Sequence, residues 1–113
     1  MMTNEELNTE LYKKAHMEQE AFRAELLSMS GEEILEHAYE YVVREDLLLS
    51  LEYHDLENAQ AKALLKEDKP LASLFNRFES RETDYMDTVW DTIECHADEL
   101  IRDAKAKANR DAR

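Results

Sequence analysis

The chain carries its strongest helical pattern in Glu79-Ser-Arg-Glu-Thr-Asp-Tyr-Met-Asp-Thr-Val-Trp-Asp-Thr-Ile-Glu-Cys-His-Ala-Asp-Glu-Leu-Ile101. Apolar residues recur in it every three or four positions, as they do on one face of an α-helix that turns by about 100° per residue. These residues are Met86, Val89, Trp90, Ile93, Ala97, Leu100 and Ile101. The pattern predicts a helix that packs this side against a hydrophobic core.

A second stripe in the same segment is acidic, and it lies about 130° around the helix from the apolar one. It consists of Asp84, Asp87, Asp91, Glu94 and Asp98. Like charges at these spacings cost a few tenths of a kcal/mol per pair, so a helix shaped only for stability would interleave lysines. We therefore take the five acidic residues as the candidate partner-binding surface. The competing interpretation is an ordinary solvated helix face.

The composition predicts an all-α fold, because the residues that form tight turns are nearly absent. The 113 residues include one Gly and one Pro, with 43% hydrophobic and 36% charged residues. A chain of this length can bury one core without the help of a metal or a disulfide. We expect a compact bundle of four to five helices in a single domain, residues 1–101. Residues 102–113 are expected to form a basic, Ala-rich helical end that frays.

Helix boundaries follow from local capping signals. Capping-box spacings at residues 3–6 and 30–33 predict two helix starts, and we expect these helices to end near residues 28 and 54. A short third helix is expected over residues 56–66. Pro70 suits the first position of a fourth helix. Whether that helix breaks near Ser80 or continues into the acidic segment stays open.

The apolar periodicity also predicts which side chains face the core. They are Leu7, Leu11, Ala15, Phe22 and Leu26, then Ile34, Ala38, Tyr41, Val42, either Leu48 or Leu49, and either Leu51 or Leu56, then Ala59, Ala63, Leu64 and Leu65, and finally Leu71, Leu74, Phe75 and Phe78. The run 47–51 is apolar nearly all round, which predicts full burial. Lys13, Lys14 and Arg23 are expected to be solvated. Glu10, Glu18 and Glu25 are taken as plain surface charges.

The net charge of −13 argues against direct binding to nucleic acid or to an anionic membrane, since both require clustered cations. It favours a basic protein partner, or it serves only solubility. The charge is uneven, because residues 70–99 carry eight acids and two bases while residues 100–113 carry two acids and five bases. The start lacks the features of a signal peptide, and no apolar run approaches the length of a membrane span. We expect a cytoplasmic protein.

The sequence offers no catalytic or metal-binding motif. The four histidines, His16, His37, His54 and His96, do not form a Glu-x-x-His or His-x-x-x-His pair. Cys95 is the single cysteine, and it cannot chelate an ion together with its neighbour His96, because adjacent helical side chains diverge. A single glycine excludes glycine-rich phosphate loops. We predict a protein that is not an enzyme and uses no metal and no cofactor.

Several segments resemble a small helical domain of unknown function that occurs in gut bacteria and their mobile elements, in phage and conjugative-element proteins. The resemblance covers roughly residues 10–100. It rests on His37-Ala-Tyr-Glu-Tyr41, Leu51-Glu-Tyr-His-Asp55, Gln60-Ala-Lys-Ala-Leu-Leu65 and, most densely, residues 82–94. It implies no activity and assigns no residue a role. Its context implies a small acidic protein of the kind that mobile elements use against host restriction and CRISPR nucleases.

The leading hypothesis is thus a non-catalytic acidic inhibitor of a bacterial defence nuclease, most plausibly a CRISPR effector. Five carboxylates from Asp84 to Asp98 supply one charge per roughly 4 Å of helix axis, and a DNA strand supplies a phosphate per about 3.4 Å. The helix would therefore act as a nucleic-acid mimic in a basic channel. The alternative is a helical protein–protein interaction or scaffold module whose charge serves only solubility.

Overall fold

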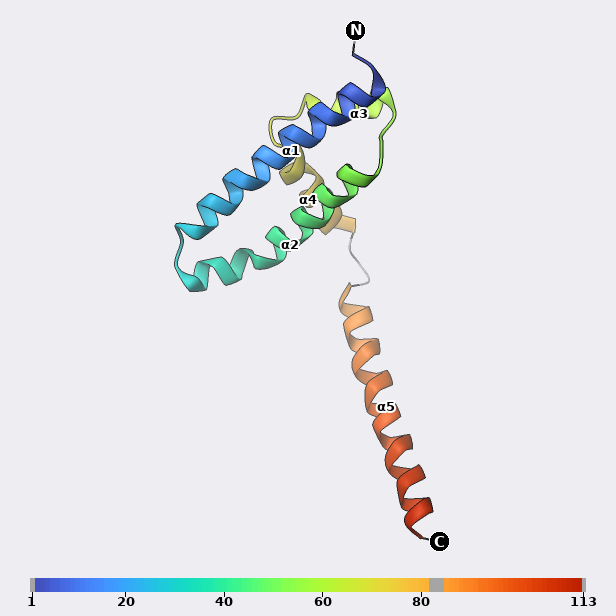
Figure 1. The fold of residues 1–113 in the computed structure, drawn as a ribbon. Helices are drawn as coiled ribbons and strands as arrows, with labels where there is room; N and C mark the ends of the chain where they lie inside the picture. The colour runs from blue at the N-terminus through green and yellow to red at the C-terminus, as the bar shows by residue number, and fades with distance from the viewer. Residues whose placement is uncertain (1, 82–84, 113) are drawn as a thin grey trace. The chain divides into compact units, whose positions relative to one another are not determined.

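The structure is a computed structural model that describes residues 2–81 and 85–112, and this part of the chain is all α-helical, without a strand. Five helices follow one another (Figure 1): α1 (Asn4–Leu27), α2 (Gly31–Tyr53), α3 (Asn58–Leu65), α4 (Pro70–Arg81) and α5 (Tyr85–Asp111). The chain divides into two compact units, Met1–Glu79 and Ser80–Arg113. The first unit contains α1, α2, α3 and most of α4, and the second contains α5.

The predicted helix starts are confirmed. The Thr3 hydroxyl accepts a hydrogen bond from the backbone N–H of Glu6 at 3.1 Å, and the Ser30 hydroxyl accepts one from Glu33 at 3.2 Å. Both caps satisfy backbone donors that have no partner within the helix. Pro70 is the first residue of α4, as expected. Since α4 ends at Arg81 and α5 begins at Tyr85, these two helices are separate elements.

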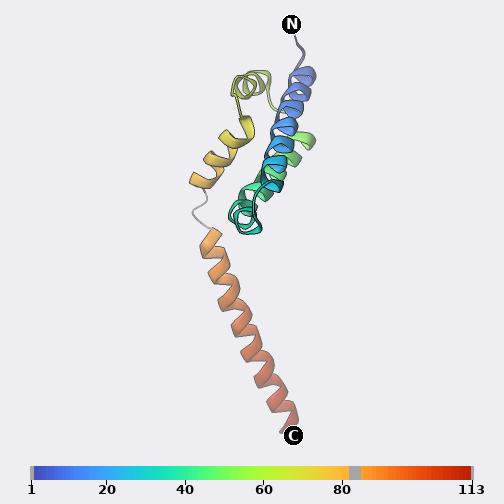
Figure 2. The ribbon, with the colours of Figure 1, turned by 90° about the vertical axis from the view of Figure 1, so that its left-hand side faces the viewer.

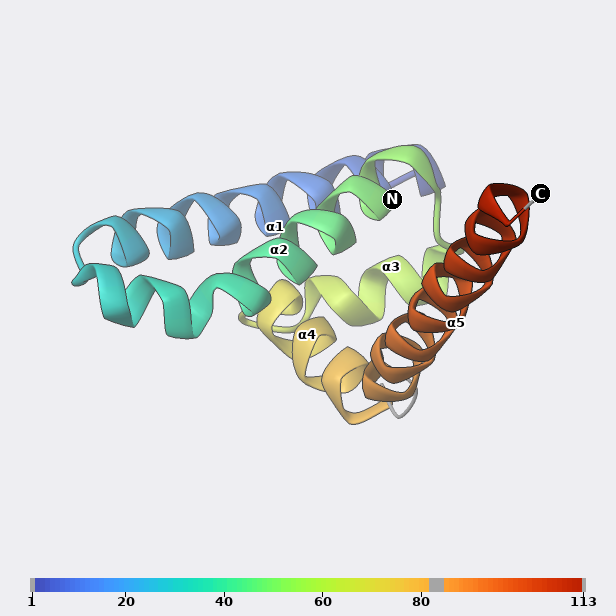
Figure 3. The same ribbon diagram turned by 90° about the horizontal axis from the view of Figure 1, so that it is seen from below.

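The first unit is assembled on α1. The loop after Leu27 reverses the chain, so α2 runs antiparallel beside α1, and α3 also contacts α1. Figures 2 and 3 show α3 and α4 together on one side of the α1–α2 pair. The centre of the core is formed by Ala15, Leu48 and Leu71, one residue each from α1, α2 and α4. The side chains of Tyr12, Leu47 and Leu51 pack around them.

Most of the predicted core of α1 and α4 is confirmed, and part of that of α2 and α3 is wrong. Leu7, Leu11, Ala15, Leu26, Leu71 and Phe75 are buried. In α2, however, Val42 is more than half exposed while Val43 is buried. The predicted full burial of the run 47–51 is also wrong, because Leu48 is buried but Leu49 is more than half exposed. Residues 47–51 are apolar on several sides, so periodicity alone does not select the side that packs. In α3, the buried residue is Ala61, rather than the predicted Ala59 or Ala63, and Phe78 of α4 is exposed.

The prediction of a single compact bundle that includes α5 is wrong. Only α1 to α4 form a bundle, whereas α5 has no buried residue. The Trp90 side chain is 59% exposed, and Met86, Ile93, Leu100 and Ile101 are all more than half exposed. An amphipathic pattern shows that one face of a helix is apolar, but it does not identify the surface that covers that face. The basic end is helical as far as Asp111. That residues 1–101 act as one domain stays a prediction.

Candidate functional site

The candidate acidic surface lies on α5. Asp87, Asp91, Glu94 and Asp98 are exposed, and Asp84 lies outside the described residues. Because they are three or four positions apart, successive carboxylates stand about one helical turn from each other. In the described part of the chain none of the four forms an ion pair with a Lys or Arg side chain. The four side chains therefore form a row of negative charge open to solvent.

The same helix offers an apolar surface next to this row. Met86, Trp90, Ile93 and Leu100 recur at helical spacing and are exposed. Exposed apolar residues of this size, at regular spacing along one helix face, are typical of surfaces that bind another protein. With 27 residues, α5 extends for about 40 Å. It thus presents both charge and apolar area over a length comparable to the diameter of a small domain.

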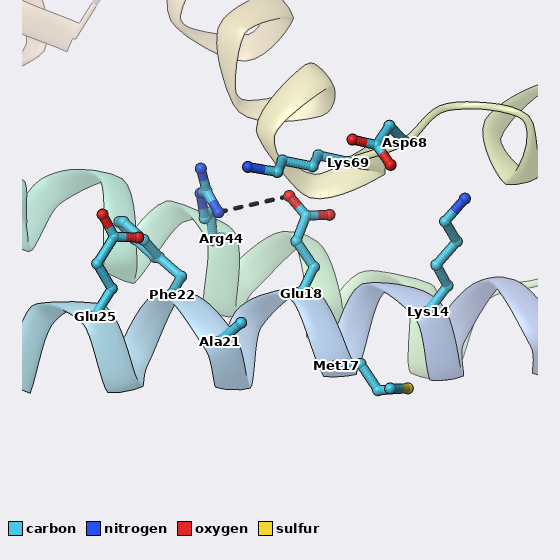
Figure 4. A pocket seen from close by; sticks show the side chains of 9 residues that line it. All are labelled: Lys14, Met17, Glu18, Ala21, Phe22, Glu25, Arg44, Asp68 and Lys69. Carbon is cyan, nitrogen blue, oxygen red and sulfur yellow. Dashed lines mark ion pairs between the residues drawn. The ribbon is translucent and has the colours of Figure 1, made fainter.

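A second candidate site is a hollow of about 410 Å³ in the first unit. Figure 4 shows the side chains that line it, which come from α1, α2 and the segment before α4. They are Lys14, Met17, Glu18, Ala21, Phe22, Glu25, Arg44, Asp68 and Lys69. Three cations and three carboxylates meet here, and several of these charges already have partners in the fold.

Glu18 already has structural partners. Its two carboxylate oxygens accept hydrogen bonds from the backbone N–H groups of Leu71 at 2.8 Å and Ala72 at 2.9 Å. These donors belong to the first turn of α4, where the helix dipole also favours a negative charge. Glu18 therefore caps α4 from a neighbouring helix, and its side chain is only 10% exposed. The expectation that Glu18 is a plain surface charge is wrong.

Arg44 is the counter-charge of this cap. Its guanidinium lies 3.6 Å from the Glu18 carboxylate, forms an ion pair with Glu40, and sits 4.0 Å above the ring of Phe22. A guanidinium buried to this degree requires such partners, because an unpaired charge in the interior is strongly unfavourable. Arg44 Nε is buried and, among the described residues, has no hydrogen-bond partner. The Arg44 guanidinium neutralises the Glu18 carboxylate. Because Glu18 lies on α1, Arg44 lies on α2 and Glu18 caps α4, this ion pair is part of the packing of the three helices.

Two more polar residues of α1 bind the backbone at the end of α3 and in the connection between α2 and α3. Lys14 Nζ donates to the backbone carbonyls of Leu65, at 2.9 Å, and Glu67, at the end of α3 and just beyond it, where carbonyls lack a partner within the helix. The Asn8 amide exchanges two hydrogen bonds with the backbone of Leu56, at 2.8 and 2.9 Å. The prediction of a solvated Lys14 is therefore wrong. The sequence did contain one hint of such polar contacts, because Asn8 and Gln19 lie beside the apolar face of α1. The structure shows that both residues are buried.

The described residues contain no group of three or more His, Cys, Asp or Glu side chains arranged to hold a metal ion. His16 lies 4.0 Å from Glu20, and His96 lies 4.0 Å from Glu99, each within a single exposed helix face. Within the described ranges, no helix has the length and apolar character needed to cross a membrane. The charged hollow of the first unit is explained by the fold, and α5 remains as the surface that the fold does not explain.

These features define the class of protein: an all-α domain whose helix ends are tied together by polar side chains of α1, with a long acidic amphipathic helix. The chain belongs to the DUF3848 family, described as a protein of unknown function, whose model matches residues 7–101. The match spans α1 to α4 and continues along α5 as far as Ile101. No curated protein and no solved structure matches the chain significantly.

Proposed function

We propose that this chain is a non-catalytic inhibitor, encoded by a mobile element, that blocks a bacterial defence nuclease by mimicking nucleic acid with α5. The observation that carries the proposal is the exposed acidic row Asp87, Asp91, Glu94 and Asp98, which the fold does not use. Like-charge repulsion along this row costs stability. A basic partner that neutralises the row offsets this cost and gains attraction at each carboxylate.

Two observations support different parts of this proposal. The resemblance to a domain of mobile elements supports a defence nuclease as the target, and the acidic row supports mimicry as the mode of binding. Nucleases of the CRISPR-effector class hold a guide–target duplex in a positively charged channel and contact its backbone rather than its sequence. A rigid row of carboxylates one helical turn apart can replace phosphates in such a channel. The inhibitor would then compete with DNA for the same cations, without cleaving or modifying the nuclease.

A second candidate function is a helical protein–protein interaction module whose charge serves only solubility. The observation that favours it is the exposed apolar face of α5, with Trp90 59% exposed. A partner that accepts this face would bury the aromatic ring in a groove, as other amphipathic helices are bound. The two functions use different sides of α5, so they respond differently to salt.

The test is direct binding of the fluorescently labelled chain to a purified, guide-loaded CRISPR nuclease at several salt concentrations. Mimicry predicts binding that weakens steeply from about 0.05 to about 0.3 M salt and that is displaced by target DNA. Binding that is unchanged by salt and is not displaced by DNA would favour the interaction module. A panel of such nucleases that shows no binding at all would reject the inhibitor proposal.

A further inference from the structure

The apolar face of α5 is symmetric about Cys95. Its apolar residues form pairs that are equally spaced about Cys95: Met86 with Ala104, Val89 with Ile101, Trp90 with Leu100, and Ile93 with Ala97. The two residue numbers of each pair have the same sum. A second helix that runs in the opposite direction therefore presents the same apolar face, with the two members of each pair exchanged.

This symmetry is what a two-fold interface between identical helices requires. In such an interface the same surface is used on both copies, and residue i of one copy meets residue j of the other while j meets i. In an antiparallel pair centred on Cys95, Trp90 of one copy meets Leu100 of the second. Ile93 meets Ala97 of the second copy in the same way. Large side chains thus face smaller ones, as close packing between helices requires.

The spacing of the central residues also suits two helices that wrap around each other. Met86, Trp90, Ile93, Ala97, Leu100 and Ala104 are separated by four, three, four, three and four positions. This alternation is the a and d repeat of a coiled coil, in which apolar side chains interlock along a continuous seam. Cys95 lies on the opposite side of the helix from this seam, because it is two residues from both Ile93 and Ala97.

The charges on α5 favour the antiparallel direction over the parallel one. Residues 85–99 carry five acids and no base, whereas residues 100–111 carry four bases and two acids. A parallel pair would place the two acidic segments against each other over their whole length. An antiparallel pair brings Arg102 and Lys105 of one copy to the level of Asp87 of the other, and it also opposes the helix dipoles.

We infer that a second copy of this chain covers the apolar face of α5, through an antiparallel α5–α5 pair with a two-fold axis at the level of Cys95. The inference does not depend on the proposed function, although Asp87 and Glu94 of the acidic row also face charges of the second copy in this pair. It makes the chain a homodimer. One local conflict remains in the pair, because Glu94 of each copy flanks the seam close to the axis and meets its own equivalent.

The first test is the mass of the full chain by sedimentation equilibrium. The chain is expected at twice its 13.3 kDa at micromolar concentrations and above. Leu100→Ala removes one contact from each copy and should weaken the dimer on the order of a hundredfold. Cys95→Ala, on the opposite side of the helix, is the matched control and should leave the dimer unchanged. Glu94→Gln should tighten the dimer, since it removes the repulsion at the axis.

The second test is disulfide trapping in a Cys95→Ser background, which fixes the direction of the pair. The double variant Ile93→Cys with Ala97→Cys should form an interchain disulfide under mild oxidation, because these positions face each other. The single variant Ala97→Cys should link slowly, since its two copies are offset by four rises, about 6 Å, along the axis. A chain that is monomeric at about 100 μM, or a single variant that links as fast as the double one, overturns the inference.

Discussion

At the scale of single residues, the bundle depends on polar side chains of α1 that reach the ends of other helices. Asn8, Lys14 and Glu18 each bind backbone groups at a helix end or in the connection beside one. Such bonds matter more than surface ion pairs, because losing one leaves a partly buried backbone group unsatisfied. Periodicity finds the apolar residues of α1, but it cannot find these three roles, which depend on residues about fifty positions away.

Replacing Glu18 tests this network. Glu18→Gln keeps the size of the side chain but removes its charge and one of its two good acceptors, and it leaves Arg44 with Glu40 alone. We expect a loss of about 1–3 kcal/mol in the free energy of unfolding. Urea denaturation followed by far-UV circular dichroism measures it. Glu10→Gln, whose exposed carboxylate lies 3.7 Å from Lys13, is the control and should change stability by less than about 0.5 kcal/mol.

The raised pKa of Tyr12 predicts that the stability of the fold falls at alkaline pH. Burial raises the pKa of the Tyr12 phenol above its usual range, and the charges of Glu52 and Glu45 raise it further. The folded state therefore favours the neutral phenol. Its contribution to stability is complete below the unfolded pKa of about 10 and is lost as the pH rises through the higher folded pKa.

The Tyr12→Phe variant isolates this contribution. The wild-type chain should lose stability faster than the variant as the pH is raised from about 9 to about 11. Denaturant midpoints at each pH provide the measurement. Parallel curves for the two proteins would show that Tyr12 has the same pKa in the folded and unfolded states.

At the scale of elements, capping signals were the most reliable part of the sequence. Residues at the helix starts act through atoms only a few positions away, so the bounds of α1, α2 and the start of α4 were predictable. The choice of the buried face was less predictable in α2, where apolar residues surround the helix. It was least predictable in α5, because amphipathicity does not name a partner. The acidic row could also be found in the sequence, because its residues are only three or four positions apart on one helix.

The contrast between α4 and α5 gives a paired prediction. Leu71 is fully buried in the core, so Leu71→Ala should cost about 2–5 kcal/mol of bundle stability. Trp90→Ala removes a larger side chain, but one that is 59% exposed on α5, and should change the unfolding of the bundle by less than about 1 kcal/mol. Unfolding is followed by tyrosine fluorescence at low protein concentration. A large loss with Trp90→Ala would place Trp90 in the core of the bundle.

At the scale of the whole molecule, the chain consists of two compact units, and the core belongs to the first. All its buried hydrophobic residues in the described ranges lie between Leu7 and Phe75. The composition predicted the all-α class, but the division of the chain was not predictable from it. The apolar stripe of α5 looks the same in a sequence whether it packs within the chain or against another protein.

This division predicts that residues 1–79 fold without α5. The shortened chain should keep a cooperative urea transition with a midpoint close to that of the full chain, because the core and the helix-end contacts are all retained. Circular dichroism during urea titration is the measurement. Loss of a cooperative transition would show that α5 is required for the core.

We propose that the acidic row of α5 binds a basic partner, and a comparison of two triple variants tests this binding. The variant Asp87→Asn, Asp91→Asn and Asp98→Asn removes three charges from the row. Its control, Glu10→Gln, Glu20→Gln and Glu36→Gln, removes three exposed charges from α1 and α2. Both should fold as stably as the wild-type chain, since no core residue changes.

The measurement is the affinity of each protein for a guide-loaded CRISPR nuclease at about 0.1 M salt, where exposed charges still act over about 10 Å. We expect the α5 variant to bind at least about tenfold more weakly, a loss of about 1.4 kcal/mol or more, while the control stays close to wild type. Equal losses for both variants would mean that net charge alone drives the interaction, and unchanged affinity of the α5 variant would show that the acidic row does not bind the nuclease.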